Sequence, residues 1–547
     1  MRSYTLIFLV FCLTLFSCAI VVAPSGGEKD ITPPRVLNTE PANYSANFTG
    51  EEVTIEFDEY IELKDIYNNF ITSPPLPAKP EIVIRGKSVV MKFDGPLPSH
   101  STFNFAFGNS IVDIHEGNSI EDYQFVISTD SFVDSMTLEG KVIHASSLEP
   151  VKDVWVTLYE CRDYNSCDSL PLKELPTYLA RTGKEGLFRL RNIKTGKYKV
   201  FALVDKNRNY LFDLPNESIG FVGNLVEAGD SSLLSLRIFD QEDGNQKITK
   251  VWTIEPGFSK IAFKLPVDHL DVSVLNYASK TRWEVVGYCA SRDTVSYWNT
   301  SGMDSLRLHI RDSHYSFEDT ITVELGQKKE LKRLAVSTNV SRSKMLDIGK
   351  PLLILLSRPL TIYNDQRIRL YERLDSATLA LVDFTSSFTD ETRKRINISH
   401  NWKPGSSYSI EGDKAAFTGL FGGKSDSFSV DFAVGKEEYY GNAEVEITFP
   451  ERKHAYVVQL LNPRGGVSRE DLVQPQNSGQ TLKVKLEYPY TPPGKYRLKV
   501  IYDMNNNGRW DTGDHVENRQ PERIAFSKDD ILIRANWDQV LDWTLDP

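Results

Sequence analysis

The chain has 547 residues, of which 40% are hydrophobic and 25% are charged, a composition that fits about four or five globular domains. Its net charge of −11 argues against nucleic acid as a partner, because such a partner requires a basic face. Gly, Pro, Tyr and Phe are plentiful and helical runs rich in Ala or Leu are scarce, so we expect an all-β chain.

The first 34 residues predict export and lipid anchoring. Arg2 precedes an apolar run over residues 6–15, which is too short to span a bilayer and has the length of a signal-peptide core. The run ends in Leu15-Phe16-Ser17-Cys18, which resembles a bacterial lipobox. The resemblance implies a signal peptide over residues 1–17 and a diacylglycerol on Cys18. A plain secretory signal with a chance cysteine is the alternative.

The residues after Cys18 bear on where the protein lives. Ala19 is not the aspartate that, by the rule for lipoproteins, retains them at the inner membrane, so the outer membrane is the expected location. Residues 18–34 are interpreted as a tether, because Pro and Gly interrupt them and they lack periodicity. No compact acidic cluster follows Cys18, so the sequence leaves open whether the protein faces the periplasm or the cell surface.

Residues 35–130 predict a β-sandwich. Apolar residues alternate in short stretches, such as Val53, Ile55 and Phe57, at intervals of roughly ten residues. The strings ITPPRVLNTEPAN, EFDEYIEL, LPSHSTFNFAFGNSIVDIHEGN and YQFVIST, with the PSGGEKD tether, resemble the SbsA-type Ig-like domain that opens a family of Bacteroidota envelope lipoproteins. That resemblance implies a domain type and no catalytic residue.

Residues 135–240 are similar to prealbumin-like β-sandwiches of the carboxypeptidase-regulatory type. A G-x-V strand, a T-x-x-G-x-F hairpin and a G-x-Y-x-V strand carry this likeness, with Gly186 in the hairpin. Cys161 and Cys167 are close enough in sequence to form a disulfide in an oxidising compartment, and two free thiols are the alternative.

The rest of the chain predicts a repeat of this pair. Residues 241–347 are interpreted as an additional β domain, residues 351–435 as a second Ig-like domain and residues 437–547 as a second prealbumin-like β-sandwich. The expected fold is therefore all-β, with serial Ig-like and prealbumin-like β-sandwich domains joined by short linkers.

A polar loop follows one strand in each prealbumin-like copy, and its spacing predicts a Ca²⁺ site. In the second copy, oxygen-bearing residues take positions 1, 3, 5, 7, 9 and 12 of the loop, with the turn glycine Gly508 at position 6. The residues are Asp503, Asn505, Asn507, Arg509 through its carbonyl, Asp511 and Asp514. The first copy offers a weaker version, because Tyr210 replaces the glycine. Its residues are Asp205, Asn207, Asn209 and Asp213. Rigid turns without metal are the alternative for both loops.

No motif of an enzyme accompanies these domains. A nucleophile elbow, a zinc-protease helix and a dinucleotide-binding loop are all missing, so we expect no enzymatic activity. The sequence favours an outer-membrane lipoprotein that serves as a scaffold or accessory subunit of an envelope assembly, including one that inserts or exports outer-membrane proteins, with a barrel protein as partner. The alternative is a cell-surface protein for glycan binding or adhesion, in which Trp510, Trp537 and Trp543 stack on sugars instead of capping the core.

Overall fold

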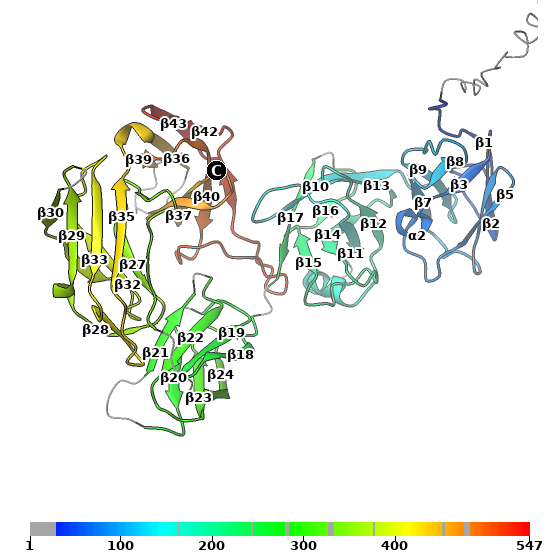
Figure 1. Cartoon of the computed structure of the whole chain (residues 1–547). Helices are drawn as coiled ribbons and strands as arrows, with labels where there is room; N and C mark the ends of the chain where they lie inside the picture. The colour runs from blue at the N-terminus through cyan, green and yellow to red at the C-terminus, as the bar shows by residue number, and fades with distance from the viewer. Residues whose placement is uncertain are drawn as a thin grey trace, which may run out of the picture. The chain divides into compact units, whose positions relative to one another are not determined.

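The computed structural model describes residues 29–161, 164–230, 232–241, 244–267, 269–278, 284–289, 291–325, 333–375, 378–450, 454–474 and 482–546. Almost all regular structure in these residues is β-strand, as Figure 1 shows, which confirms the expected all-β class. The chain divides into two compact units, of which the first holds residues 1–143 and 149–238 and the second holds residues 144–148 and 239–547. No helix in the described part is long and apolar enough to cross a membrane.

The first sandwich has its core between two sheets, ordered β1-β2-β6-β5 and β4-β7-β9, with β3-β8 as a third pair. Its elements are β1 (Val36–Glu40), β2 (Glu52–Phe57), β3 (Ile61–Leu63), α2 (Ile66–Asn69), β4 (Ile71–Ser73), β5 (Glu81–Arg85), β6 (Ser88–Lys92), β7 (Thr102–Gly108), β8 (Ile111–Asp113) and β9 (Tyr123–Ser128). Because side chains alternate along a strand, Ile55 of β2 and Phe105 of β7 both point inward and are fully buried.

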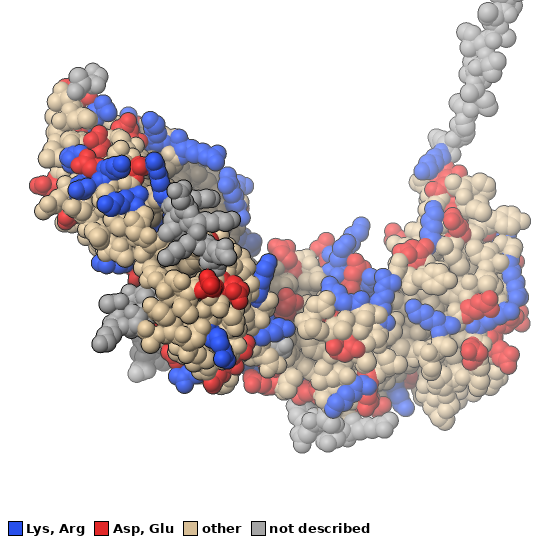
Figure 2. All heavy atoms as spheres, turned by 60° about the horizontal axis from the view of Figure 1, so that its bottom comes forward, with Lys and Arg blue, Asp and Glu red and all other residues tan. Residues whose placement is uncertain are grey.

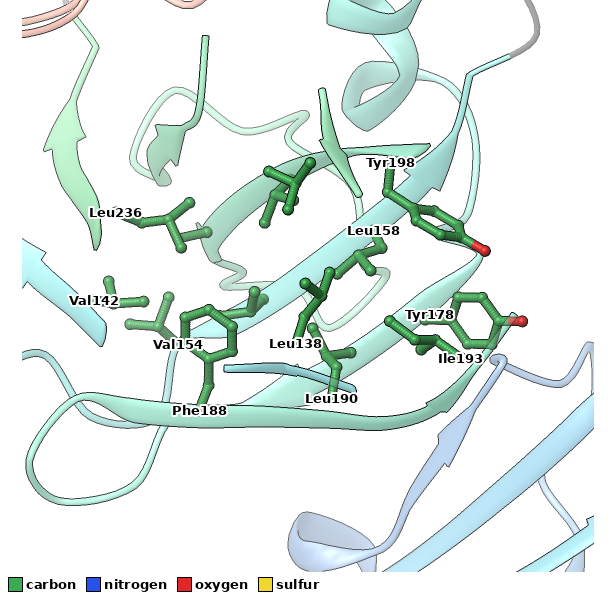
Figure 3. Close-up of a cluster of buried hydrophobic side chains, with 14 of the residues drawn as sticks. Leu138, Val142, Val154, Leu158, Tyr178, Phe188, Leu190, Ile193, Tyr198 and Leu236 are labelled. Carbon is green, nitrogen blue, oxygen red and sulfur yellow. The ribbon is translucent and has the colours of Figure 1, made fainter. Parts of the chain in front are cut away.

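The second sandwich forms one sheet in the order β12-β11-β14-β15-β17-β10-β13, with β16 also on β14. Its elements are β10 (Met136–His144), β11 (Trp155–Glu160), η1 (Tyr164–Leu172), β12 (Tyr178–Arg181), β13 (Leu187–Ile193), β14 (Lys197–Val204), β15 (Ser218–Phe221), β16 (Val226–Glu227) and β17 (Leu234–Asp240). Figure 3 shows Leu138, Leu158 and Leu190 converging from three strands. The hairpin glycine, Gly186, has a φ of 71° and a side chain there would clash with the Val142 carbonyl.

The third sandwich packs the sheet β18-β19-β22-β21 against the sheet β20-β23-β24. Its strands are β18 (Ile248–Glu255), β19 (Phe258–Phe263), β20 (Asp271–Val274), β21 (Glu284–Tyr288), β22 (Thr294–Asn299), β23 (Ser305–Asp312) and β24 (Phe317–Glu324). Its core ends at Leu325. The predicted boundary at residue 347 is therefore wrong, because Leu334 and Leu346 are buried in the next core.

The fourth sandwich repeats the strand order of the first. Its sheets are β25-β27-β32-β31, β26-β35-β33-β29-β30 and β28-β34, so β27, β33 and β28 take the places of β2, β7 and β3. The elements are β25 (Val336–Thr338), β26 (Met345–Leu346), β27 (Leu352–Leu356), β28 (Leu360–Tyr363), η2 (Asp365–Arg367), β29 (Ile368–Arg373), β30 (Leu379–Val382), β31 (Thr385–Phe388), β32 (Arg395–Ser399), β33 (Ser407–Gly412), β34 (Phe417–Gly419) and β35 (Phe428–Val434).

The fifth sandwich repeats the strand order of the second. The order β38-β37-β40-β41 matches β12-β11-β14-β15, and the order β39-β36-β43 matches β13-β10-β17. In addition, β42 pairs with β40 as β16 pairs with β14. The elements are η3 (Glu437–Tyr439), β36 (Gly441–Phe449), β37 (Ala455–Leu461), β38 (Val467–Val473), β39 (Leu482–Thr491), β40 (Gly494–Asp503), β41 (Ile524–Phe526), β42 (Ile531–Ile533) and β43 (Asp538–Thr544). The chain thus contains the same two-domain module twice.

Candidate functional site

The second polar loop begins where β40 ends. The side chain of Asp503 is fully buried, and its Oδ1 and Oδ2 accept hydrogen bonds from the backbone N–H groups of Asn507, at 3.0 Å, and Gly508, at 2.7 Å. Gly508 has a φ of 78°, a left-handed conformation that glycine adopts without strain. The loop is therefore held closed by the first residue of the predicted metal pattern.

Four predicted ligands of this loop lie together. The amide nitrogens of Asn505 and Asn507 each donate to Asp511 Oδ2 at 2.6 Å, and Asp503 closes the loop. Asp514 is engaged elsewhere, because its Oδ1 accepts from the backbone N–H of Glu517 at 3.0 Å. The backbone N–H of Arg509 donates to Asn507 Oδ1 at 3.0 Å.

The first polar loop, after β14, repeats this arrangement. Asp205 accepts from the backbone N–H groups of Arg208, at 2.5 Å, and Tyr210, at 2.8 Å. The amides of Asn207 and Asn209 donate to the two oxygens of Asp213 at 3.0 and 2.7 Å. Tyr210 takes the position of the turn glycine with a φ of 62°, and its ring packs edge-on against Trp155. The missing glycine therefore does not prevent the turn.

A buried glutamate supports each loop, a role that the ligand spacing in the sequence does not reveal. Glu522 accepts from the N–H groups of Met504 and Asp511 at 2.7 and 3.1 Å, and burial raises the pKa of its carboxyl group. Glu217 accepts from the equivalent groups of Lys206 and Asp213, both at 3.0 Å. The spacing from the loop differs between the copies, so the usable signal is an acidic residue just before the next strand, β15 or β41.

The chemistry of the loops fits Ca²⁺ only in part. Ca²⁺ takes six to eight oxygen ligands. Asp503, Asp511 and two amides would supply four side chains, and the amides would have to turn their oxygens inward in place of the nitrogens that now contact Asp511. Within the described ranges, no three His, Cys, Asp or Glu side chains gather as a metal site. Calcium binding at both loops stays a prediction.

The cysteines differ in whether they are bonded and in whether the structure describes them. Cys161 and Cys167 form a disulfide, with their Cα atoms 5.7 Å apart. Cys289 is a free thiol. Cys18, the expected lipidation site, lies outside the described residues, so its acylation and the signal peptide stay predictions.

The three candidate tryptophans differ in exposure. The indole N–H of Trp510 donates to the Glu522 carbonyl at 2.8 Å, and its ring packs against a small core with Val457. Trp543 packs against the main core of the fifth sandwich. Only Trp537 is well exposed, at 61%. The structure therefore does not gather these rings into one sugar platform.

A cleft of about 460 Å³ lies between the two sandwiches of the first unit. Hydrogen bonds join the two sandwiches at this cleft, from Leu179 N–H to Ser73 Oγ at 3.1 Å and, from the lining residue Arg181, from Nη1 to the carbonyl of the nearby Asn68 at 2.9 Å. Arg191 pairs with Asp122 across the cleft at 3.2 Å. Its lining has five basic and two acidic side chains, which makes it basic in an acidic chain. The residues are Lys152, Arg181, Lys184, Arg189 and Arg191, with Asp122 and Asp153.

Comparison with known proteins identifies the class of the first domain. Residues 30–129 match the family described as a bacterial Ig-like domain, so the Ig-like interpretation of this region is confirmed. The chain as a whole is a serial β-sandwich protein with a bacterial Ig-like domain at its start. No curated protein matches the sequence.

Similar solved structures include fragments of Dscam1 and a bacterial pilin subunit. The N-terminal four Ig domains of Dscam1 isoform 4.44 are 8% identical, with 74% of this chain and 100% of that chain covered and a TM-score of 0.16. BcpA, the major pilin subunit of Bacillus cereus, is 11% identical, with 75% and 99% covered and a TM-score of 0.15. Scores this low carry no argument about function, and the SbsA-type and Bacteroidota lipoprotein assignments stay predictions.

Proposed function

We propose that this protein is a non-enzymatic outer-membrane lipoprotein that acts as a scaffold or accessory subunit of an envelope assembly. Cys18 carries the acyl anchor, whose strength rises by about 0.8 kcal/mol for each buried methylene. The β-sandwiches set the spacing, and their edges and loops contact the partner, for which an outer-membrane barrel protein that takes part in insertion or export of membrane proteins is the proposed example. This last step is an analogy with the resembled family.

The observation that supports a scaffold best is the repeated module. Both copies share their strand order except at the β15–β17 pairing, which β41 and β43 lack, and their polar loops are closed by their own hydrogen bonds instead of presenting an acid and a base to a substrate. In the first copy the two sandwiches are joined by several hydrogen bonds, including Arg208 Nη1 to Asn68 Oδ1 at 2.8 Å. Positioning of bound partners needs rigid spacing of this kind.

Affinity isolation from detergent-solubilised membranes tests the proposal. We expect the full chain to recover a defined membrane protein in constant ratio, and we expect Cys18→Ser to move the protein to the soluble fraction. Recovery as a lone monomer would contradict the scaffold. Membrane retention of the Cys18→Ser variant would contradict the anchor.

A second candidate function, glycan binding, is favoured by the basic cleft of the first unit. Ligand sites often lie between domains and have volumes of about 300–1,000 Å³. The cleft combines the surplus of basic groups with amide groups such as those of Asn104 and Gln124, which suits an acidic sugar. Retention on an acidic polysaccharide column that falls with Arg191→Gln, but not with the exposed control Arg85→Gln, would support it. Equal retention of both variants would exclude the cleft as the glycan-binding site.

A further inference from the structure

The last strand of the second module, β43, leaves a sheet edge open. It pairs in parallel with β36, and it has no second neighbour among the described strands. Its counterpart in the first module, β17, lies between β10 and β15. The same position in the fold is therefore covered by a strand in one copy and uncovered in the other.

The difference comes from the strand before this edge. In the first module β15 pairs with both β14 and β17, which joins all these strands into one sheet. In the second module the equivalent strand β41 has only three residues, and among the described strands it pairs with β40 alone. An open edge presents unpaired N–H and C=O groups, which is the template for adding a strand from another chain.

The side chains of β43 define what such a strand should look like. Val540 is 59% exposed, and Asp538 and Asp542 stand two residues to either side of it, so all three point to the same face. The neighbouring glutamates are already paired, because Lys485 binds Glu444 at 2.8 Å and Lys483 binds Glu446 at 2.7 Å. The two aspartates make no ion pair among the described residues, so the outer row is acid, apolar, acid.

A hollow of about 600 Å³ adjoins this edge and has the same sign of charge. Its lining includes four acidic side chains and no Lys or Arg. These are Glu437, Glu444, Glu487 and Asp538. The aromatic rings of Tyr440 and Tyr490 also line it. Lys485 already pairs with Glu444 at 2.8 Å and with Glu487 at 3.4 Å. The hollow therefore suits a long basic side chain whose stem packs on the rings while its charge meets Glu437 and Asp538.

We propose that β43 is a docking edge for an extended segment of a partner protein whose outward row reads basic, apolar, basic at alternate residues. The proposal rests on the proposed scaffold function and names the partner chemistry for it. A second copy of this chain is a poor occupant, because antiparallel pairing about Val540 places Asp538 opposite Asp542, and like charges directly opposite each other are destabilising. The charges on β43 thus disfavour pairing with β43 of a second copy and favour pairing with a basic strand.

Peptide binding to the full chain tests this proposal. The probe is a labelled peptide with the sequence Thr-Arg-Thr-Val-Thr-Arg-Thr, and the control peptide has Glu in place of Arg. We expect the double variant Asp538→Lys with Asp542→Lys to bind the basic peptide at least tenfold more weakly and to bind the acidic peptide instead. The matched control changes two exposed acids elsewhere in the same sandwich, Asp529→Lys and Asp530→Lys, and should leave both affinities unchanged.

The outcomes separate this inference from the scaffold proposal. Equal binding of the basic peptide to wild type and to the Asp538/Asp542 variant would overturn the docking edge, as would self-association of the wild-type chain through β43. If the membrane partner is recovered equally by both forms, the docking edge is wrong while the scaffold stands. If the wild type binds the basic peptide and the Asp538/Asp542 variant binds the acidic one, but no partner is recovered from membranes, the docking edge stands and the scaffold is wrong.

Discussion

Single buried carboxylates shape the turns of this protein, and Asp113 in the first Ig-like domain shows how. Its Oδ1 accepts from the N–H groups of His115, Glu116 and Gly117 at 3.0, 2.6 and 3.0 Å, and its Oδ2 accepts from Asn118 at 2.7 Å. Desolvation would raise the pKa of Asp113, but these four bonds outweigh it and lower the pKa to about 2.

This pKa gives a prediction for acid stability. A folded-state pKa below the usual value of about 3.8 means that Asp113 stabilises the fold above that pH, and that the contribution is lost as the pH falls toward 2. We expect Asp113→Asn to lower the thermal midpoint at pH 7 and to differ little from wild type near pH 2. Asp94→Asn, at an exposed turn of the same sandwich, should have no effect at either pH. A constant penalty for Asp113→Asn across this range would contradict the assignment.

At the same scale, substitution of Asp503 distinguishes its role in closing the turn from a role in binding Ca²⁺. Asp503→Ala leaves the backbone N–H of Gly508 without an acceptor and leaves that of Asn507 with only Asn505 Oδ1, so we expect it to lower the free energy of unfolding by about 1–3 kcal/mol even in chelator. If Ca²⁺ binds, it should raise the unfolding midpoint of wild type and not that of Asp503→Ala. Asp530→Ala is the exposed control. If Ca²⁺ does not change the unfolding midpoint of the wild type, the predicted calcium site is wrong while the turn-closing role of Asp503 stands.

Between elements, one ion pair joins the third and fourth sandwiches of the second unit. Arg358 is buried and donates two hydrogen bonds of 2.6 Å to the carboxylate of Glu255 at the end of β18. The interaction raises the pKa of Arg358, which keeps it charged. A bidentate pair of this kind fixes the angle between the two elements that carry it.

Arg358→Met should destabilise the protein, because it leaves the carboxylate of Glu255 without its partner. We expect a loss of at most about 3 kcal/mol, with much of it recovered in the double variant Arg358→Met with Glu255→Leu. Denaturant unfolding of the single and double variants provides the test. If the two substitutions add with no recovery, the pair does not couple the sandwiches.

Most strands could be predicted from the sequence, because their apolar residues alternate, as Val53, Ile55 and Phe57 do. The short strands β25 and β26 could not, since two or three residues show no period, and the boundary between the third and fourth sandwiches was misplaced for that reason. The open edge at β43 was also beyond the sequence, because it depends on which distant strand pairs with which. The supporting role of Glu522 needed the structure for the same reason.

At the scale of the whole chain, both signs of charge are mixed over the face seen in Figure 2. The division into two compact units predicts that heat unfolds the chain in more than one step. In calorimetry, Asp113→Asn should shift only the transition of the first unit, and Asp503→Ala only that of the second. One transition that moves as a whole in both variants would contradict two independent units.

The most direct test of the scaffold is chemical cross-linking in intact cells, followed by mass spectrometry of the cross-linked peptides. We predict that lysines of both modules form reproducible cross-links to the same small set of envelope proteins, and that Cys18→Ser abolishes these cross-links while the fold is retained. Cross-links confined to the chain itself, or a partner set that is unchanged in the Cys18→Ser variant, would contradict a lipid-anchored scaffold.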